Sequence, residues 1–349
     1  PGEYSRKYKL ARRGPASTGL QPQPPIWNQA GYCACKSQKV KPNFDGCGFS
    51  LHSGLGSLAS PPMKTLFAAL VLAGSLLPGQ AEPLRALIVD GQNNHDWKAT
   101  TPVLKKTLEE TGLFTVEVAT APGENNASLA AFKPDFAKYK VIVMNYNGAM
   151  WSEATRKAFE DYMSGGGGLV VVHAADNSFA PWPAYNEMIA VGGWNGRDGK
   201  SGSYLRWRDG KQVLDSKPGP AGSHGAQHEF LVVTRAPEHP IMAGLPAEWL
   251  HAKDELYDYM RGPAQNATIL ATAFADKKYG GSGENEPQLL AISYGKGRVF
   301  HDMLGHGPEA MKCVGFITTL QRGTEWAATG KVTQKVPADF PKADAVSLR

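Results

Sequence analysis

The segment Gly165–Asp176, GGGGLVVVHAAD, limits the possible folds more than any other part of the chain. Leu169–Val172 is a short apolar run rich in β-branched residues, which is typical of strands covered on both faces of a parallel sheet. The four glycines before it permit a tight turn into that strand. Because ligands of open α/β sheets bind at the carboxyl ends of the strands, we expect His173 and Asp176 to lie at a binding site.

Similar apolar strands alternate with amphipathic helices from residue 84 onward. Patterning predicts strands at 84–90, 114–120, 140–146, 168–175, 229–234, 267–274, 288–294 and 298–304. Helices are predicted at 100–111, 152–163 and 308–328. Residues 181–227 show no lasting period and are predicted to form a long inserted loop region. This order of elements predicts a three-layer α/β domain at 82–330 with a mostly parallel sheet, followed by a C-terminal tail at 331–349.

The residues before this domain have the pattern of an export signal. Met63 is the first methionine, and Lys64, the apolar run 66–77 and Gly79-Gln80-Ala81 follow it. A basic start, a short apolar stretch and a small-residue exit are typical of a secretory signal peptide, here 63–81. The apolar run is too short for a membrane span. We therefore expect a secreted or periplasmic protein, with residues 1–62 as an untranslated or disordered leader.

Charge and motif content narrow the classes of partner. The formal net charge of +5 comes from the residues before Glu82, so the predicted domain is about neutral and no nucleic-acid partner is indicated. The chain contains neither a Walker loop nor a GxGxxG motif, so no nucleotide cofactor is expected. No Ser or Cys stands beside His173, where a nucleophile elbow would place one. Cys313 is the one cysteine of the predicted domain and is expected to be a buried, inert thiol.

Polar side chains follow several of the predicted strands, and they are the candidate site residues. In chain order they are Asn94, His95, Asp96, Asn145, Asn147, His173, Asp176 and His306. In a parallel sheet these strand ends share one edge. Imidazoles and carboxylates are ligands for zinc and related divalent ions, and amides suit sugar hydroxyls. His228 could join from the returning end of the inserted region, and Glu255 from the element at 254–259.

Each candidate also has a structural alternative. His173 could simply bond a neighbouring carbonyl, and His95 could be a solvated loop residue. Trp182 could stack on a sugar ring, although most tryptophans belong to the core. Asp254 is expected to be a cap, and His301 a packed or edge residue.

Six motifs in order along residues 84–333 resemble the trehalose-utilisation, or ThuA-like, family. They are ALIVDGQNNHDW, GGGGLVVVHAAD, EHPIMAGLP, KDELYDY, YGKGRVFHDMLGH and TEWAATGKVT. The resemblance implies a flavodoxin-like, class I glutamine-amidotransferase-like fold without the catalytic cysteine of that group. It also implies a role in carbohydrate catabolism beside sugar oxidoreductases that make 3-keto-glycosides. The site residues that it implies are His95, His173, His228 and His306, with Glu255 from the DELY motif.

Together these observations predict an exported enzyme that cleaves or isomerises 3-keto-glycosides or disaccharides with a divalent metal ion, zinc or similar. The metal ligands would be His95, His173, His228 and His306. His173, Asp176 or Glu255 would remove the proton that the ketone acidifies. The predicted substrate-binding residues are Asn94, Asp96, Asn145, Asn147 and Trp182. Two alternatives remain open: a non-catalytic saccharide-binding module, and a metal-free glycoside hydrolase that uses Asp176 or Glu255.

Overall fold

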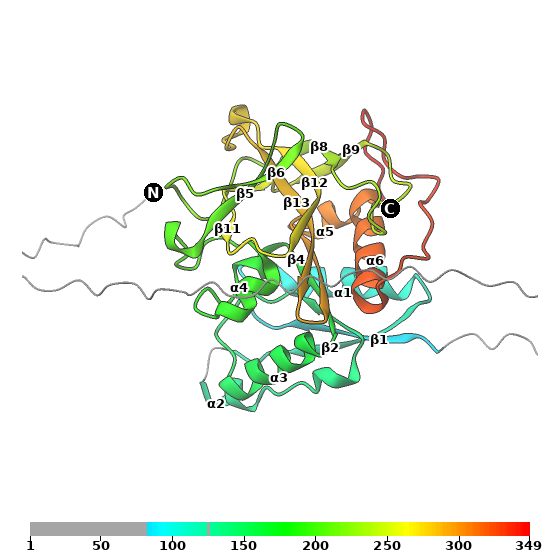
Figure 1. Ribbon diagram of the computed structural model, residues 1–349. Coiled ribbons are helices and arrows are strands. Elements are labelled where there is room, and N and C mark those ends of the chain that lie inside the picture. The colour runs from blue at the N-terminus through cyan, green and yellow to red at the C-terminus, as the bar shows by residue number, and fades with distance from the viewer. Residues whose placement is uncertain (1–81, 124–125) are drawn as a thin grey trace, which may run out of the picture. The chain divides into compact units, whose positions relative to one another are not determined.

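The computed structural model describes residues 82–123 and 126–349, so the predicted leader and signal peptide lie outside the described residues. Over that described part, every helix is too short or too polar to cross a lipid bilayer. The described residues form one α/β unit, drawn in cyan to red in Figure 1.

A nine-stranded sheet forms the centre of the fold, in the order β2-β1-β3-β4-β14-β13-β12-β8-β9. Its strands are β1 (Leu84–Asp90), β2 (Phe114–Thr120), β3 (Val141–Met144), β4 (Gly168–Val172), β8 (His228–Thr234), β9 (Glu248–Asp254), β12 (Ala267–Phe274), β13 (Asn285–Tyr294) and β14 (Gly297–Asp302). The pairs from β2 to β14 are parallel. The pairs from β14 to β9 are antiparallel. Within this sheet β13 and β8 are therefore reversed, and the other seven strands run in one direction, as the mostly parallel prediction requires.

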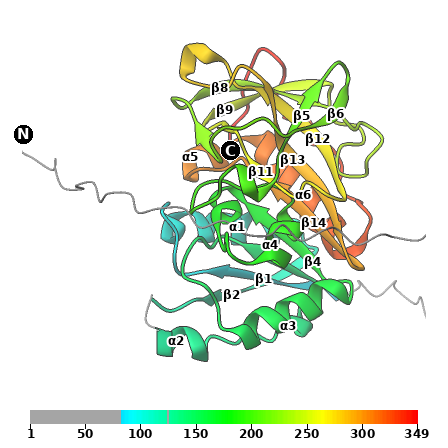
Figure 2. The ribbon, with the colours of Figure 1, turned by 60° about the vertical axis from the view of Figure 1, so that its left-hand side comes forward.

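Helices cover both faces of the parallel half (Figures 1 and 2). One apolar core joins alternate residues of β1, β3 and β4 to α1 (Trp97–Glu109) and α6 (Val314–Thr329). A second core joins the remaining residues of those strands to α3 (Glu153–Ser164) and α4 (Pro183–Ile189). Since the side chains of a strand alternate between its two faces, near-continuous apolar strands need both layers. The predicted three-layer α/β architecture is confirmed.

The region predicted as a long inserted loop contains several short regular elements. They are α4, β5 (Ser203–Arg208), β6 (Lys211–Asp215) and β7 (Ser223–His224). β5 pairs with β6 and with β11 (Arg261–Gly262), while β7 pairs with β10 (Tyr257–Asp258). The sequence pattern did not predict these strands because they are short. In addition, Arg206 of β5 is a charged residue at a buried position, where it pairs with Glu286.

The end of the chain also differs in detail from the prediction. The closing helix is broken at Lys312 and Cys313 into α5 (Pro308–Met311) and α6. Cys313 is buried, as expected. The predicted tail packs against the antiparallel half of the sheet, where Leu250 donates its backbone N–H to Lys342 O at 2.8 Å. The remaining helix, α2 (Asn126–Ala131), lies between β2 and β3 along the chain.

Candidate functional site

The fold brings strand ends that are distant in sequence to one edge of the sheet. His95 follows β1, His173 follows β4, Glu255 follows β9 and His306 follows β14. His173 has a φ of 45° where β4 turns into a 3-10 helix. That left-handed conformation costs a residue with a side chain about 1–3 kcal/mol, and such strain gathers at functional sites. His173 therefore occupies the sharp strand-end turn that was considered as a nucleophile elbow.

The carboxylate of Glu255 lies at the centre of four imidazoles. His306 Nε2 is 3.2 Å from Glu255 Oε1, and His224 Nε2 is 3.7 Å from the same oxygen. His173 Nε2 and His95 Nε2 lie 3.5 Å and 3.7 Å from Oε2. The rings of His95, His173 and His306 meet edge to face, with centroids 4.6–5.5 Å apart. We call these five residues the His–Glu cluster.

Hydrogen bonds behind the rings orient two of the imidazoles. His173 Nδ1 lies 2.8 Å from Met303 O, and His95 Nδ1 lies 3.3 Å from Asn93 Oδ1. With the proton on Nδ1 in each case, the Nε2 lone pair faces the cluster. His173 Nε2 is buried and has no hydrogen-bond partner among the described residues. A buried atom of this kind is expected to have a use, such as binding a ligand or a proton.

Asp254 fixes the loop that carries His306. Its Oδ2 accepts the backbone N–H of Gly305 at 2.7 Å and lies 2.9 Å from His251 Nε2. Its Oδ1 accepts the N–H of His306 at 3.1 Å. Asp254 was expected to be a cap, but it is the last residue of β9 and ties that strand to the loop after β14. The one sequence feature that could have indicated this role for Asp254 is its position directly before Glu255.

Burial and charge shift the pKa values of the cluster in different directions. Burial would raise the pKa of Glu255, but the neighbouring imidazoles of His173 and His95 outweigh burial and hold that pKa well below its usual value. Burial lowers the pKa of His306, which the charge of Glu255 only partly offsets. For His173 the burial effect is outweighed by the neighbouring carboxylates of Glu255 and Asp254, so its pKa is raised. The cluster thus contains an ionised carboxylate.

Three of these residues have the geometry of a metal site. One ligand atom each of His95, Glu255 and His306 lies within 4.8 Å of the others. In a tetrahedral zinc site neighbouring ligand atoms lie about 3.3 Å apart. A small movement of these three side chains toward one another would therefore let all three bind one ion. Two imidazole nitrogens and one carboxylate are also a donor set that zinc accepts in catalytic sites. The residues fit a divalent transition metal.

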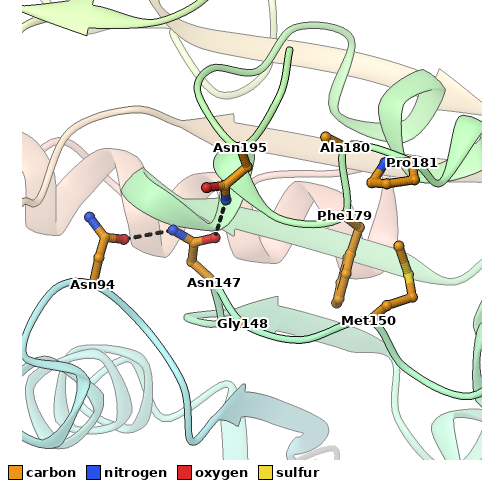
Figure 3. A pocket seen from close by; sticks show the side chains of 8 residues that line it. All are labelled: Asn94, Asn147, Gly148, Met150, Phe179, Ala180, Pro181 and Asn195. Atoms are coloured by element: carbon orange, nitrogen blue, oxygen red, sulfur yellow. Dashed lines mark hydrogen bonds between the residues drawn. The ribbon is translucent and has the colours of Figure 1, made fainter. Parts of the chain in front are cut away.

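A cavity of about 360 Å³ opens onto the His–Glu cluster. Its lining residues are Asn94, His95, Asn147, Asn177, Trp194, Asn195, His224, Glu255 and Tyr257. Among the predicted substrate-binding residues, Asn94 and Asn147 are in this set. Asn94 Oδ1 accepts from Asn147 Nδ2 at 2.6 Å, and Asn147 Oδ1 accepts from Asn195 Nδ2 at 2.9 Å (Figure 3). Asn195 was not predicted, because the candidates were taken from strand ends and Asn195 lies in the region predicted as a long loop.

Three other predicted residues serve the fold around the cavity. Asp96 caps α1 by accepting the N–H of Ala99 at 3.1 Å. Asn145 is buried and donates to the hydroxyls of Thr100 and Thr101 at 2.9 and 3.0 Å. Asp176 is fully buried, with Oδ2 at 3.1 Å from His301 Nε2. His301 is buried, as expected.

Trp182 and His228 also lie away from the cluster. Trp182 is 2 % exposed, packs among aromatic residues and donates Nε1 to Glu160 at 2.5 Å. His228 stacks on Tyr279 with ring centroids 3.7 Å apart, and its Nδ1 contacts Ala226 O. Successive side chains of an extended segment point to opposite sides. Gln227, the residue before His228, points toward Glu255, and its Nε2 donates to Glu255 Oε1 at 3.5 Å. His224 takes the place in the cluster that was expected of His228.

Comparison with known proteins gives one matching family profile and several similar solved structures. The profile of the trehalose-utilisation family, ThuA, matches residues 85–327. A ThuA-like protein from Parabacteroides merdae is 48 % identical, and the match covers 77 % of this chain and 98 % of that chain with a TM-score of 0.75. A ThuA-like protein from Bacteroides uniformis is 20 % identical, with 73 % and 95 % covered and a TM-score of 0.48. No curated protein matches the chain.

Proposed function

The chain belongs to the trehalose-utilisation (ThuA) family, and from this premise we propose that it is an enzyme that cleaves or isomerises 3-keto-glycosides with the help of a divalent metal ion. The observation that carries the proposal is the Glu255 carboxylate, which lies 3.2–3.7 Å from four imidazoles at the base of a cavity. Amide and aromatic side chains line that cavity, and such side chains suit a sugar ring.

His95, Glu255 and His306 would hold the metal ion. When bound, it would act as a Lewis acid that draws electron density from the sugar carbonyl, which makes the adjacent C–H bond more acidic. The loop fixed by Asp254 keeps His306 in place for this role. His224 and His173 stay beside the three ligands, free for proton transfer.

The cavity residues would orient the sugar. Asn94, Asn147 and Asn177 offer amide groups that can donate to and accept from hydroxyls. Trp194 and Tyr257 line the same cavity with ring centroids 4.9 Å apart and can pack against the apolar face of a pyranose. A volume of about 360 Å³ suits one hexose ring.

His173 is the candidate base. Its Nδ1 bonds Met303 O, and its Nε2, which lies 3.5 Å from Glu255 Oε2 and has no hydrogen-bond partner among the described residues, would accept the proton from C2, next to the C3 ketone. In cleavage the C2–H electron pair becomes the C1–C2 double bond as the C1–O bond breaks, and His224 can give a proton to the departing oxygen. In isomerisation the proton held by His173 returns to carbon instead.

The alternatives have less support. Hydrolysis by two carboxylates needs a second acid beside the sugar, and Glu255 is the one carboxylate among the described residues that line this cavity. Asp176, the other acid considered, is fully buried against His301. A pure binding module would need neither a strained, unpartnered histidine nor a carboxylate among imidazoles.

The test is turnover of methyl 3-keto-glucoside by the full chain, with unoxidised methyl glucoside as control. We expect turnover of the keto form alone, its loss on treatment with chelator, and its return with zinc or manganese. Turnover that survives exhaustive chelation would support the metal-free hydrolase. Saccharide binding without turnover, and without bound metal, would support the binding module.

Two wider proposals rest on the sequence. A sugar oxidoreductase that forms the ketone would have to supply the substrate. Export to the periplasm or beyond would follow from the signal-like segment 63–81. Fusion of that segment to a reporter active only outside the cytoplasm would test export.

A further inference from the structure

A second cavity of about 450 Å³ adjoins the first and has no role in the chemistry described so far. Its lining residues are Asn94, Asn147, Gly148, Met150, Phe179, Ala180, Pro181 and Asn195. Asn94, Asn147 and Asn195 line both cavities, so their amide chain forms the boundary between them. A molecule anchored at the His–Glu cluster can therefore extend past these amides into the second cavity.

The two sides of this second cavity differ in chemistry. Figure 3 shows the three linked asparagines on one side and Met150, Phe179 and Pro181 on the other. The apolar side, including Ala180, has no side-chain nitrogen or oxygen. On the amide side, the hydrogen bonds along the chain already use Asn94 Oδ1 and Asn147 Oδ1 as acceptors. Asn195 Nδ2 also donates to Asn177 O at 2.8 Å.

The apolar side is held rigidly. Phe179 packs against Tyr146, Trp151 and Trp182 with ring centroids 5.0–5.6 Å apart. Its φ of 53° is unusual for an aromatic residue and persists only where the surroundings fix it. The wall is therefore formed before any ligand arrives, so binding an apolar group against it costs little ordering of the protein.

We propose that the second cavity is the leaving-group subsite and that it takes a flat apolar aglycone, such as a phenyl ring. This assignment rests on the proposed function, because it places the reacting sugar at the His–Glu cluster. A second sugar ring would bring several hydroxyl groups against an apolar wall, where they would lose their hydrogen bonds with water. An aromatic ring needs only the apolar wall and leaves the amide chain intact.

The test compares the binding of phenyl glucoside and methyl glucoside to the full chain by calorimetry. We expect the phenyl compound to bind at least about fivefold tighter. Ala180→Phe fills the second cavity without touching the first, so it should abolish this preference and leave methyl glucoside binding unchanged. Ala158→Phe, at an exposed position of α3, is the matched control and should change neither. Met150→Asn is a second variant, which should weaken the phenyl preference by making the wall polar.

Three results would overturn the assignment. They are equal binding of the two glucosides, an equal loss of both in Ala180→Phe, and tighter binding of a glucose disaccharide than of phenyl glucoside. Turnover of the 3-keto forms separates this proposal from the proposed function. A phenyl preference without turnover leaves the subsite standing and removes the chemistry. Turnover that responds neither to the aglycone nor to Ala180→Phe leaves the proposed chemistry standing and removes the subsite.

Discussion

Asp254 Oδ1 accepts the backbone N–H of His306 at 3.1 Å, across 52 residues of sequence. The other oxygen of the same carboxylate accepts from Gly305 at 2.7 Å. One buried side chain at the end of β9 thus sets the position of an imidazole that follows β14, 3.2 Å from Glu255. The geometry of the His–Glu cluster depends on a residue that does not itself line the cavity.

Asp254→Asn should weaken metal binding without removing a ligand. The amide keeps one acceptor oxygen, but its NH₂ group must face a backbone N–H, so the loop with His306 shifts. Loss of such an outer partner commonly costs about 10–100-fold in metal affinity. Calorimetric titration of the chelator-treated full chain measures the change. Asp135→Asn, at an exposed position with an ion pair to Lys138, is the control and should be neutral. Unchanged affinity in Asp254→Asn would show that the loop is held by other contacts.

Trp182 should matter for stability and not for sugar binding. The sequence suggested a stacking platform, but the side chain is 2 % exposed and packed among Phe179, Tyr185 and Trp151. Trp182→Ala should therefore lower the free energy of unfolding by about 3–5 kcal/mol. Urea denaturation measures this loss. Trp194→Ala, which removes a cavity-lining ring, should instead weaken methyl glucoside binding. A large loss of sugar affinity in the milder variant Trp182→Phe would contradict this division.

The pH dependence of stability should contain a contribution from His239. Burial lowers its pKa from 6.5 to about 4 in the folded chain. Between those values the unfolded chain binds a proton that the folded chain does not, so the free energy of unfolding falls as the pH falls through this window. Above 6.5 the effect is absent. Urea titrations on both sides of the window measure it, with the nearby Trp326 as a fluorescent probe.

His239→Asn should flatten this part of the pH profile. The Asn side-chain oxygen can still accept the N–H of Ile241, which His239 Nδ1 accepts at 3.3 Å in the native chain. The variant lacks a group that titrates between these pH values. An unchanged profile would assign the slope to other residues.

The sequence predicted the parallel half of the fold well because its signals there are local and strong. Runs such as Leu169–Val172 are apolar on both faces, and the helices between them have capping residues such as Ser152. The inserted region gave no such signal. Its strands are short, and Arg206 is buried there in an ion pair with Glu286, which lies far along the chain. A contact of that kind leaves no period in the sequence.

The candidate site was predictable to the extent that strand ends define it. His95, His173 and His306 each follow a recognisable strand, and the structure brings them together. The sequence could not decide between His224 and His228, and the prediction named His228, which lies outside the cluster. Both lie in one short stretch, and only the pairing of β7 with β10 turns His224 toward Glu255.

A calorimetric zinc titration of the chelator-treated full chain tests most directly whether the His–Glu cluster binds a metal ion. We expect one ion per chain, an affinity loss of at least about tenfold in His306→Ala and Glu255→Gln, and no change in His228→Ala. Full affinity in Glu255→Gln, or a loss in His228→Ala as large as that in His306→Ala, would contradict the proposed metal site.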